Sequence, residues 1–444
     1  MHNSKWQRIL GYVSNTGGGL KMLNVSQDFL NSIGKPVLLN LFGTITIGNT
    51  TINWDKSIVE RGKFNITDKC VKSSGFSVGS VNAGTLNMNI YLPNYRAYDL
   101  LGGSISAFYG FSNENIPLGV FKITKSSPNG LGWISISAST QLIQANYYDD
   151  KESLPSTWLP KDTTPYYLLL SLCEHAHMTF GNTLEEIQAM PNGNQTFSMV
   201  DDSLTSSTTD CLSYLATILG GFVTCDRSTG YVIIKHFQTA PVWTVTPSLM
   251  YRGTLSIAGF TMNLAKVMAE FYTNGAFSAY GAAGLEELVG NPNNVVVDIS
   301  DNPFLESVYK STNIDYIIEL LINVGDKIIN VPYKPFSVSI AGNPALELGD
   351  CINIVDQNGI STTSVISQYS YTFMDKHTIK CVGEDSRLLN NVPVNQLKRS
   401  EEGINKRINS IARTSLMKKS DYIKLGENFQ KGLLYCLYDD EVST

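Results

Sequence analysis

Three residues that could bind a metal ion lie close together at Cys173, His175 and His177. Thiolate and imidazole groups are common zinc ligands. On a helix, Cys173 and His177 share a face because they are four residues apart, whereas His175 points elsewhere. No second cluster with zinc-ligand spacing lies nearby in the sequence. We therefore expect no metal here, and interpret Cys173 as buried and the two histidines as residues on a helix surface.

Neighbouring carboxylates could act as a general acid and base. Adjacent residues project apart, however, and no histidine or arginine lies close in sequence to orient the first two pairs, so we interpret all of them as solvated charges. The glycines at 17–19 lack the spacing of a phosphate-binding loop, and the sequence has no GxSxG or HExxH pattern. We thus predict no catalytic, cofactor-binding or metal-binding residues, and a protein that is not an enzyme. The carboxylate groups are Asp149-Asp150, Asp201-Asp202, Glu384-Asp385 and Asp439-Asp440-Glu441.

The composition is poor in charge. Charged residues make up 16% of the 444-residue chain, against about 25% in a typical domain. A neutral polar surface with 22 tyrosines suits β-rich proteins in large assemblies, where tyrosine is common at interfaces. The net charge of −6 argues against a protein that grips nucleic-acid phosphates. It is compatible with an acidic wall past which DNA slides.

The seven cysteines are scattered and form no CxxC pair, which indicates reduced and mostly buried thiols in a protein made in a cytosol. The first ten residues lack the apolar segment of a signal peptide. No stretch approaches the roughly 20 apolar residues of a membrane span. We expect no membrane span.

The pattern divides the chain into five parts. Residues 1–35 predict an N-terminal arm with little core of its own. Residues 36–146 alternate with period two between turn signals, which predicts an antiparallel β-domain. Residues 147–245 predict a small α+β domain, with helices starting near Pro165 and Thr208 and a hairpin at 222–237. Residues 246–392 predict a second β-domain, and 393–444 a helical segment.

Within the second β-domain we expect strands at 266–272 and 294–299, a surface loop over the small residues 275–284, and a helix at 311–321. A three-stranded meander should follow, with strands at 351–355, 363–373 and 378–382. The C-terminal segment 395–431 has the spacing of an amphipathic helix, which either packs on its own protomer or forms a seam between copies. Ser415 and Lys418 would occupy core heptad positions, so it is a weak coiled coil.

Two segments repeat one pattern. Residues 118–142 and 361–388 each run strand, polar turn, strand and short apolar tail. Two similar β-barrels would supply similar edge strands, and an edge strand needs a partner. We therefore predict that edge strands pair between protomers.

Three stretches, in this order, resemble the baseplate-hub and tail-tip hub proteins of long-tailed bacteriophages. The first is 116–123 (IPLGVFKI), before the hairpin of the first β-domain. The second is 208–221 (TTDCLSYLATILGG) with 230–234 (GYVII), a helix, glycine and hairpin unit. The third is 344–350 (PALELGD) with its following strands. The resemblance spans roughly residues 36–390.

The resemblance implies two related β-barrel or sandwich domains, a small α+β insert and a homotrimeric ring with pseudo-sixfold symmetry. Such a ring joins the tail tube to distal tail proteins, tip fibres or receptor-binding proteins, and it surrounds the channel through which DNA passes without specific binding. The protein would assemble in the host cytoplasm and reside in the virion. Relatives often continue into a peptidase, lysin or fibre domain, whereas about 55 residues follow the resemblance here.

Two other functions are compatible with the sequence. A tail-associated enzyme that degrades the cell wall would need a carboxylate pair about 5 to 10 Å apart in a cleft. A receptor- or carbohydrate-binding module could use aromatic residues, of which we expect most to lie in the core or at interfaces. The aromatic residues in question are Tyr147, Tyr148, Trp158 and Trp243.

Overall fold

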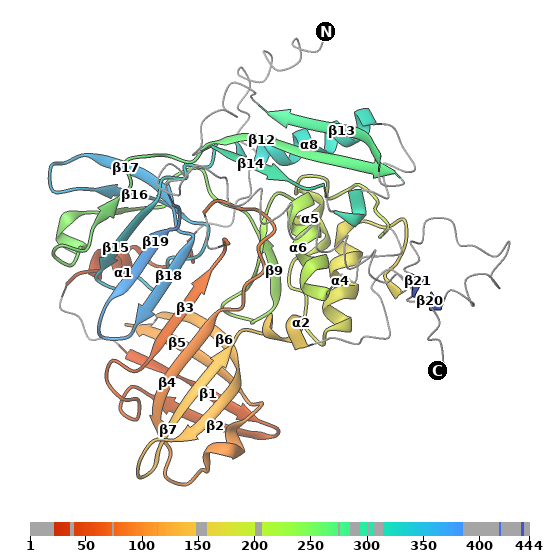
Figure 1. The fold of residues 1–444 in the computed structure, drawn as a ribbon. Helices are drawn as coiled ribbons and strands as arrows, with labels where there is room; N and C mark the ends of the chain where they lie inside the picture. The colour runs from red at the N-terminus through yellow and green to blue at the C-terminus, as the bar shows by residue number, and fades with distance from the viewer. Residues whose placement is uncertain are drawn as a thin grey trace, which may run out of the picture.

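The computed structural model describes residues 22–35, 40–72, 75–112, 114–147, 158–199, 207–273, 276–284, 294–300, 302–305, 314–384, 417–418 and 437–438. This part of the chain is mainly antiparallel β, with most of its helices gathered at one side (Figure 1). The predicted fold class, two related β-domains with a small α+β insert, is confirmed. The exact domain boundaries remain predictions.

The first β-domain is a barrel. Its strands alternate as the sequence predicts: in the fourth, Leu86, Met88 and Ile90 are buried. The segment that follows the second strand runs beside the fourth strand, where the backbone N of Tyr91 donates to Ile58 O at 2.8 Å. This contact closes the sheet. The strands are β1 (Asn40–Ile47), β2 (Thr50–Asp55), β3 (Asn65–Lys69), β4 (Thr85–Tyr91), β5 (Ser104–Phe111), β6 (Glu114–Pro128) and β7 (Trp133–Ser139). A 3-10 turn, η2 (Ala97–Leu100), precedes β5.

The described end of the predicted arm belongs to the core of this barrel. Helix α1 (Gln27–Ser32) begins at Ser26, whose Oγ accepts from Phe29 N at 3.1 Å and donates to Glu114 Oε2 at 2.7 Å. The Phe29 ring is buried and meets Tyr109 and Phe111 edge-on, with centroids 6.0 and 5.5 Å apart. Aromatic pairs favour this geometry, so α1 is anchored to β5.

The second β-domain contains two groups of strands. The first is β11 (Ser256–Ile257), β15 (Phe336–Ile340), β18 (Gln368–Thr372) and β19 (His377–Cys381). The second is β10 (Trp243–Val245), β16 (Cys351–Val355) and β17 (Ser361–Val365), with η3 (Pro247–Leu249) following β10. The predicted three-stranded meander is wrong, because the strand expected over 363–373 is broken at Ile366 and Ser367. Its first part pairs with β16 and its second part with β19.

The two β-domains share one sheet. Its strand order is β11-β15-β19-β18-β3-β4-β7-β6-β5-β1-β2. The two domains join where β18 pairs antiparallel with β3, from Gln368 opposite Lys69 to Thr372 opposite Asn65. The predicted pairing of edge strands between protomers therefore does not hold for β18 in the segment 361–388, because β3 of the same chain covers this strand.

The strand order contains one four-strand unit twice. In the first β-domain it is β3-β4-β7-β6, and in the second it is β11-β15-β19-β18. Within each unit all neighbouring strands are antiparallel. We call these the first and second four-strand units. They lie head to tail, since the last strand of the second unit pairs with the first strand of the first unit.

Local geometry repeats as well. Before β5, Gly102 N donates to Ile123 O at 3.1 Å, and before β16, Gly349 N donates to Ile366 O at 2.8 Å. Both glycines have a positive φ, 76° and 82°. Glycine adopts this conformation without the steric cost that a Cβ adds. The PALELGD segment of the sequence is thus the second copy of the turn that leads into β5.

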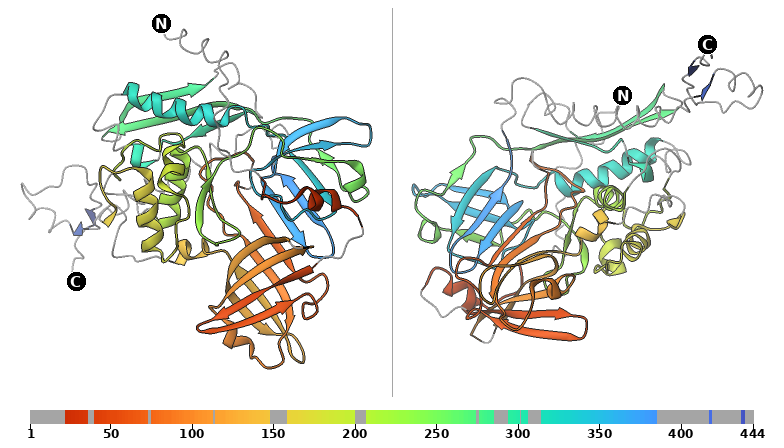
Figure 2. Two further views of the ribbon diagram at one scale, coloured as in Figure 1. Left: turned by 180° about the vertical axis from the view of Figure 1, so that it is seen from behind. Right: turned by 60° about the horizontal axis from the view of Figure 1, so that its bottom comes forward.

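The α+β unit lies beside both β-domains (Figure 2). Helix α6 begins after Ser207, which forms a capping box with Asp210, and ends before Gly220 as predicted. Its buried side includes Leu212 and Leu215. The elements are α2 (Ile143–Tyr147), α4 (Pro165–His175), α5 (Leu184–Gln188), α6 (Thr208–Ile218), β8 (Phe222–Cys225) and β9 (Val232–Lys235).

A third layer consists of β12 (Leu264–Thr273), β13 (Ala276–Gly284), β14 (Val295–Asp298) and α8 (Ile314–Ile328). The surface loop predicted over 275–284 is wrong: β13 pairs antiparallel with β12 along its length. The strand predicted at 266–272 is confirmed. The helix packs along this sheet (Figure 1), with Ile317, Leu321 and Val324 buried.

The predicted C-terminal helix lies almost entirely outside the described residues. Its described pair β20 (Met417–Lys418) runs parallel to β21 (Leu437–Tyr438), so the helix prediction is wrong at Met417 and Lys418. No helix in the described ranges is long and apolar enough to cross a membrane.

Candidate functional site

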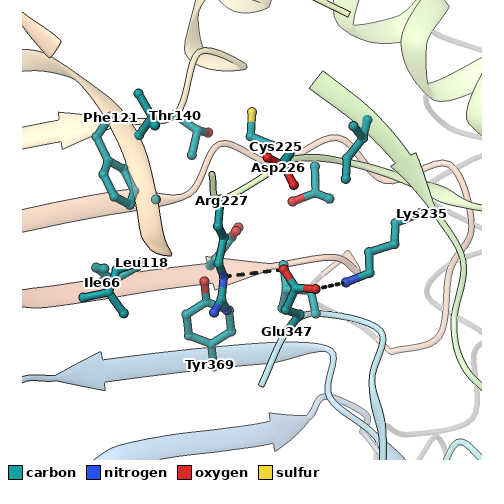
Figure 3. A pocket seen from close by; sticks show the side chains of 16 residues that line it. Ile66, Leu118, Phe121, Thr140, Cys225, Asp226, Arg227, Lys235, Glu347 and Tyr369 are labelled. Atoms are coloured by element: carbon teal, nitrogen blue, oxygen red, sulfur yellow. Dashed lines mark hydrogen bonds and ion pairs between the residues drawn. The ribbon is translucent and has the colours of Figure 1, made fainter. Parts of the chain in front are cut away.

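The two β-domains and the α+β unit meet at the turn between β8 and β9. Asp226 Oδ1 shapes this turn by accepting from the backbone N of Ser228 at 3.0 Å and of Thr229 at 2.8 Å. Gly230 completes the turn with a φ of 77°. Such side-chain to backbone bonds are typical of tight turns. The turn holds the Arg227 side chain toward the two β-domains (Figure 3).

Arg227 is the central contact. Its Nη1 and Nη2 donate to Pro344 O and Leu346 O, each at 2.7 Å, and its Nε lies 3.9 Å from Glu347 Oε1. The guanidinium also lies 5.0 Å from the ring centroid of Tyr369 in β18, within the range of a cation–π contact. One side chain of the α+β unit thus binds the turn and a strand of the second β-domain.

A second cation binds the same carboxylate. Lys235 Nζ, at the end of β9, lies 2.7 Å from Glu347 Oε2. The Lys235 side chain is only 4% exposed and that of Glu347 16%. A buried charge is tolerated when it is paired. Arg227, Lys235 and Glu347 therefore form one ion-pair group, which we call the junction triad (Figure 3).

Two further carboxylates lie near the triad. Burial raises the pKa of Asp68, at the β3 side, to about 7, although Lys69 N and the charge of Arg227 act against the shift. Burial raises the pKa of Asp350 to about 6, opposed chiefly by Lys235. Asp350 Oδ2 accepts from Glu347 N at 2.8 Å, whereas its buried Oδ1 has no hydrogen-bond partner among the described residues.

A small cavity lies beside the triad. It has a volume of about 30 Å³ and is lined by residues of both β-domains and the α+β unit, including Asp68, Phe121 and Cys225. This is room for about one water molecule. The neighbouring His377 ring is fully buried and edge-on to Tyr369 and Tyr371. Burial, reinforced by Arg227, lowers its pKa to about 3, so the imidazole is neutral at pH 7.

The same turn contacts the first β-domain. Gln141 Nε2, which follows β7, donates to Gly230 O at 2.6 Å. A Cβ on Gly230 would lie 2.8 Å from Val120 Cβ of β6, so the turn lies directly against this strand. On the other side of the α+β unit, Gly79 N donates to Gly221 O at 2.7 Å. The junction therefore fixes the α+β unit to both β-domains at once.

Asp350 makes the stability of the junction pH-dependent. Its folded pKa of about 6 exceeds the ordinary value near 3.9. The folded state therefore binds the proton more tightly, and Asp350 contributes stability that is complete below about pH 4 and is lost as the pH rises through about 6. We expect Asp350→Asn to match the wild type at pH 4 and to be more stable by about 1–2 kcal/mol at pH 7.5.

Urea unfolding of both proteins between pH 4 and 8 measures this difference. Asp375→Asn, an exposed carboxylate in the turn before β19, serves as the control. A stability difference between Asp350→Asn and wild type that stays constant over this pH range would refute the assignment.

The structure separates the residues that were considered as metal ligands. Cys173 is fully buried in α4, and burial raises the pKa of its thiol to about 12. The His175 ring stacks on Trp158 with centroids 3.8 Å apart. His177 follows the helix with a φ of 54° and is exposed. Within the described ranges, no three His, Cys, Asp or Glu side chains converge to hold a metal ion.

Most of the paired carboxylates lie outside the described residues, as do the glycines at 17–19. Asp149-Asp150, Asp201-Asp202 and Asp439-Asp440-Glu441 belong to this group, and of Glu384-Asp385 only the exposed Glu384 is described. Trp243 forms part of β10 and is half-buried. The six described cysteines are free thiols, five of them buried.

The junction triad was not predicted from the sequence. A usable signal was present: Lys235 follows Val232, Ile233 and Ile234 in a strand, where a lysine is rarely buried unless it is paired. Arg227 stands in a tight turn of a chain with few charges. Neither residue indicates its partner, because 119 residues separate Arg227 from Leu346.

Comparison with known proteins gave matches among solved structures alone. No protein-family model matches the chain, and no curated protein matches it in sequence. The chain is similar to a prophage MuSo2 tail protein from Shewanella oneidensis, with 12% identity and a TM-score of 0.46 over 77% of this chain and 98% of that one. A tail protein from Neisseria meningitidis gives 12% and 0.44 over 78% and 97%. Prophage tail protein gp18 from Listeria monocytogenes gives 11% and 0.44 over 81% and 99%.

These neighbours are phage tail proteins, the class that the three sequence motifs resemble. Structures of the phage P2 baseplate also match, with TM-scores of 0.29 and 0.30.

Proposed function

We propose that this chain is a structural subunit of a phage tail tip or baseplate. Three copies form a ring that joins the tail tube to distal tip, fibre or receptor-binding proteins and surrounds the channel for DNA. The subunit acts by its shape and its contacts rather than by catalysis. It is assembled in the host cytoplasm and resides in the virion.

The observation that carries this proposal is the repeated four-strand unit. Each chain holds two such units head to tail in one sheet, joined through β18 and β3. A head-to-tail contact is heterologous, and when it repeats between copies it produces a ring if the rotation closes. Three chains then supply six similar units, which suits a sixfold tube on one side and a threefold tip on the other.

The junction triad supports the same role. A ring subunit must hold its two four-strand units at a fixed angle, because a small error in rotation prevents closure. Arg227 and Lys235 tie the α+β unit to Glu347, and Gln141 ties it to the first barrel. The α+β unit thus braces the contact between β18 and β3. The acidic net charge suits a channel wall past which DNA moves without binding.

Sedimentation equilibrium of the purified chain over a concentration series tests this proposal. We expect a species of three times the 48.8 kDa chain mass at the highest concentrations. A stable dimer, or a chain that stays monomeric at every concentration and in the presence of its tail tube protein, would contradict the ring.

A further inference from the structure

The second half of β6 has an unpaired edge among the described residues. Residues 114–122 of β6 pair with β5, whereas Lys125 to Pro128 pair with β7 alone. Asn129 N donates to Trp133 O toward β7. Because backbone groups alternate in direction along an antiparallel strand, those of Ser126 and Pro128 face the opposite, outer side. Proline lacks an N–H and is tolerated at such an edge.

Strand β11 ends the sheet on the other side. Ser256 lies opposite Ser337 and Ile257 opposite Phe336 of β15, and Ala258 N donates to Pro335 O. By the same alternation, the backbone groups of Ile257 and Gly259 face away from β15. No partner strand covers them in the part of the chain that the structure describes.

The two edges correspond to the strands that pair inside the chain. In the first four-strand unit Ile66 of β3 lies opposite Leu86, and in the second Ile257 of β11 lies opposite Phe336. The next strand pairs correspond as well: Leu86 of β4 lies opposite Ala138 of β7, and Phe336 of β15 lies opposite Cys381 of β19. Strand β11 therefore occupies in the second unit the position of β3 in the first.

The second half of β6 occupies the position of β18 in the same way. Thr124 Oγ1 donates to Ser137 O at 3.1 Å, and Ser367 Oγ donates to Lys380 O at 3.4 Å. The next residue pairs with the same partner in each unit: Lys125 lies opposite Ser137, and Gln368 opposite Lys380. Both units thus bend at a hydroxyl residue and start the outer strand one residue later.

From this repeat we propose that β6 of one copy pairs antiparallel with β11 of a second copy, in the register of the β18–β3 contact. The surface takes a second copy of this chain, and the assignment rests on the proposed ring. Transferring the register places Lys125 opposite Phe260 and Ser127 opposite Ala258. It places Pro128 opposite Ile257, where the internal contact has Tyr371 opposite Ile66.

The side chains suit this contact. Ile66 is 3% exposed in the internal contact, whereas its counterpart Ile257 is half-buried and can lose further surface on pairing. A Cβ on Gly259 would meet no atom within 4 Å, so no side chain crowds the face of the sheet at this position. Pro128 supplies an acceptor, and Ser126 both a donor and an acceptor, to the opposing strand.

Paired cysteines test the register. Phe373 N donates to Phe64 O, so Ser370 and Thr67 form a non-hydrogen-bonded pair, in which side chains lie closest. The corresponding pair between copies is Ser127 with Ala258, at a spacing of about 4.5 Å between Cα atoms that a disulfide can span. We expect full-length Ser127→Cys/Ala258→Cys to form covalent dimers and trimers under mild oxidation.

Three controls accompany this variant. The two single variants report cross-linking through the native cysteines. Ser127→Cys/Ser256→Cys is displaced by two residues and should cross-link at least tenfold less. Thr67→Cys/Ser370→Cys should close within one chain and leave its mass unchanged.

Each outcome tests one of two proposals: the pairing of β6 with β11 between copies, which we call the seam, and the trimeric ring. A trimer by sedimentation in which Ser127→Cys/Ala258→Cys does not cross-link, or in which the displaced pair cross-links equally, overturns the seam and leaves the proposed ring intact. A protein that remains monomeric and forms no cross-link contradicts both. Gly259→Pro removes an outward N–H at a position where an added Cβ meets no atom within 4 Å, so it should abolish the trimer while the melting temperature of the monomer does not fall. A trimer that persists in this variant also counts against the seam.

Discussion

Arg227→Ala should lower the free energy of unfolding by about 3 kcal/mol, the lower end of the range for breaking a buried ion pair from one side. The loss has three sources. Pro344 O and Leu346 O lose their donors, Tyr369 loses its cation, and Glu347 keeps Lys235 as its only ion-pair partner in the described junction. The measurement is urea unfolding followed by tyrosine and tryptophan fluorescence.

Arg96→Ala is the matched control for this variant. Arg96 lies over the ring of Tyr98 at 5.8 Å but is exposed, so its removal should cost no more than about 0.5 kcal/mol. Arg227→Lys should recover part of the loss, since an ammonium cannot reach both carbonyls in the planar geometry of a guanidinium. Equal losses for Arg227→Ala and Arg96→Ala would show that the junction does not stabilise the chain.

Gly349→Ala should cost about 3 kcal/mol, the second of the largest effects. Its φ of 82° lies in the left-handed region, where a residue with a Cβ costs about 1–2 kcal/mol more than glycine. The same Cβ would lie 2.9 Å from Phe222 Cζ and 3.0 Å from His236 O, and overpacking of this kind costs about 1–3 kcal/mol. The strain falls on the turn that holds Glu347 and Asp350.

The first β-domain offers the control. Gly102 has the same conformation, with a φ of 76°, and a Cβ there would meet no atom within 4 Å. Gly102→Ala should therefore cost only the conformational part, about 1 kcal/mol. Thermal and urea unfolding of the two variants separate the backbone strain from the clash. A larger loss for Gly102→Ala than for Gly349→Ala would contradict the described packing.

Sequence patterns correctly predicted those helices and strands whose signals, such as alternation or a terminal glycine, lie within the segment itself. The alternation of Leu86, Met88 and Ile90 gave β4, and the stop at Gly220 gave the end of α6. The repeat of strand, turn and strand at 118–142 and 361–388 also gave the relation between the two β-domains, because each copy has its own turn and its own apolar alternation.

The failures have physical causes. Residues 361–372 keep one alternating pattern across Ile366, where the chain leaves one sheet and enters another, and alternation carries no information about the partner strand. The small residues of β13 have low β-propensity, yet β12 pairs with them. The sheet edges were misjudged for the same reason, since nothing local to β18 indicates that β3 covers it.

The junction triad lies beyond local prediction. Lys235 could have been marked as a buried charge, but its partner Glu347 lies far along the chain, in the second β-domain. An even longer separation in sequence hid the cation–π contact between Arg227 and Tyr369.

A three-dimensional electron microscopy reconstruction of the purified oligomer tests the central claim most directly. The proposed assembly predicts a threefold ring of six similar lobes in which one sheet continues from chain to chain, with β6 beside β11 at every boundary. A particle without threefold symmetry, or one whose chains meet through the α+β units while β6 and β11 face solvent, would contradict it.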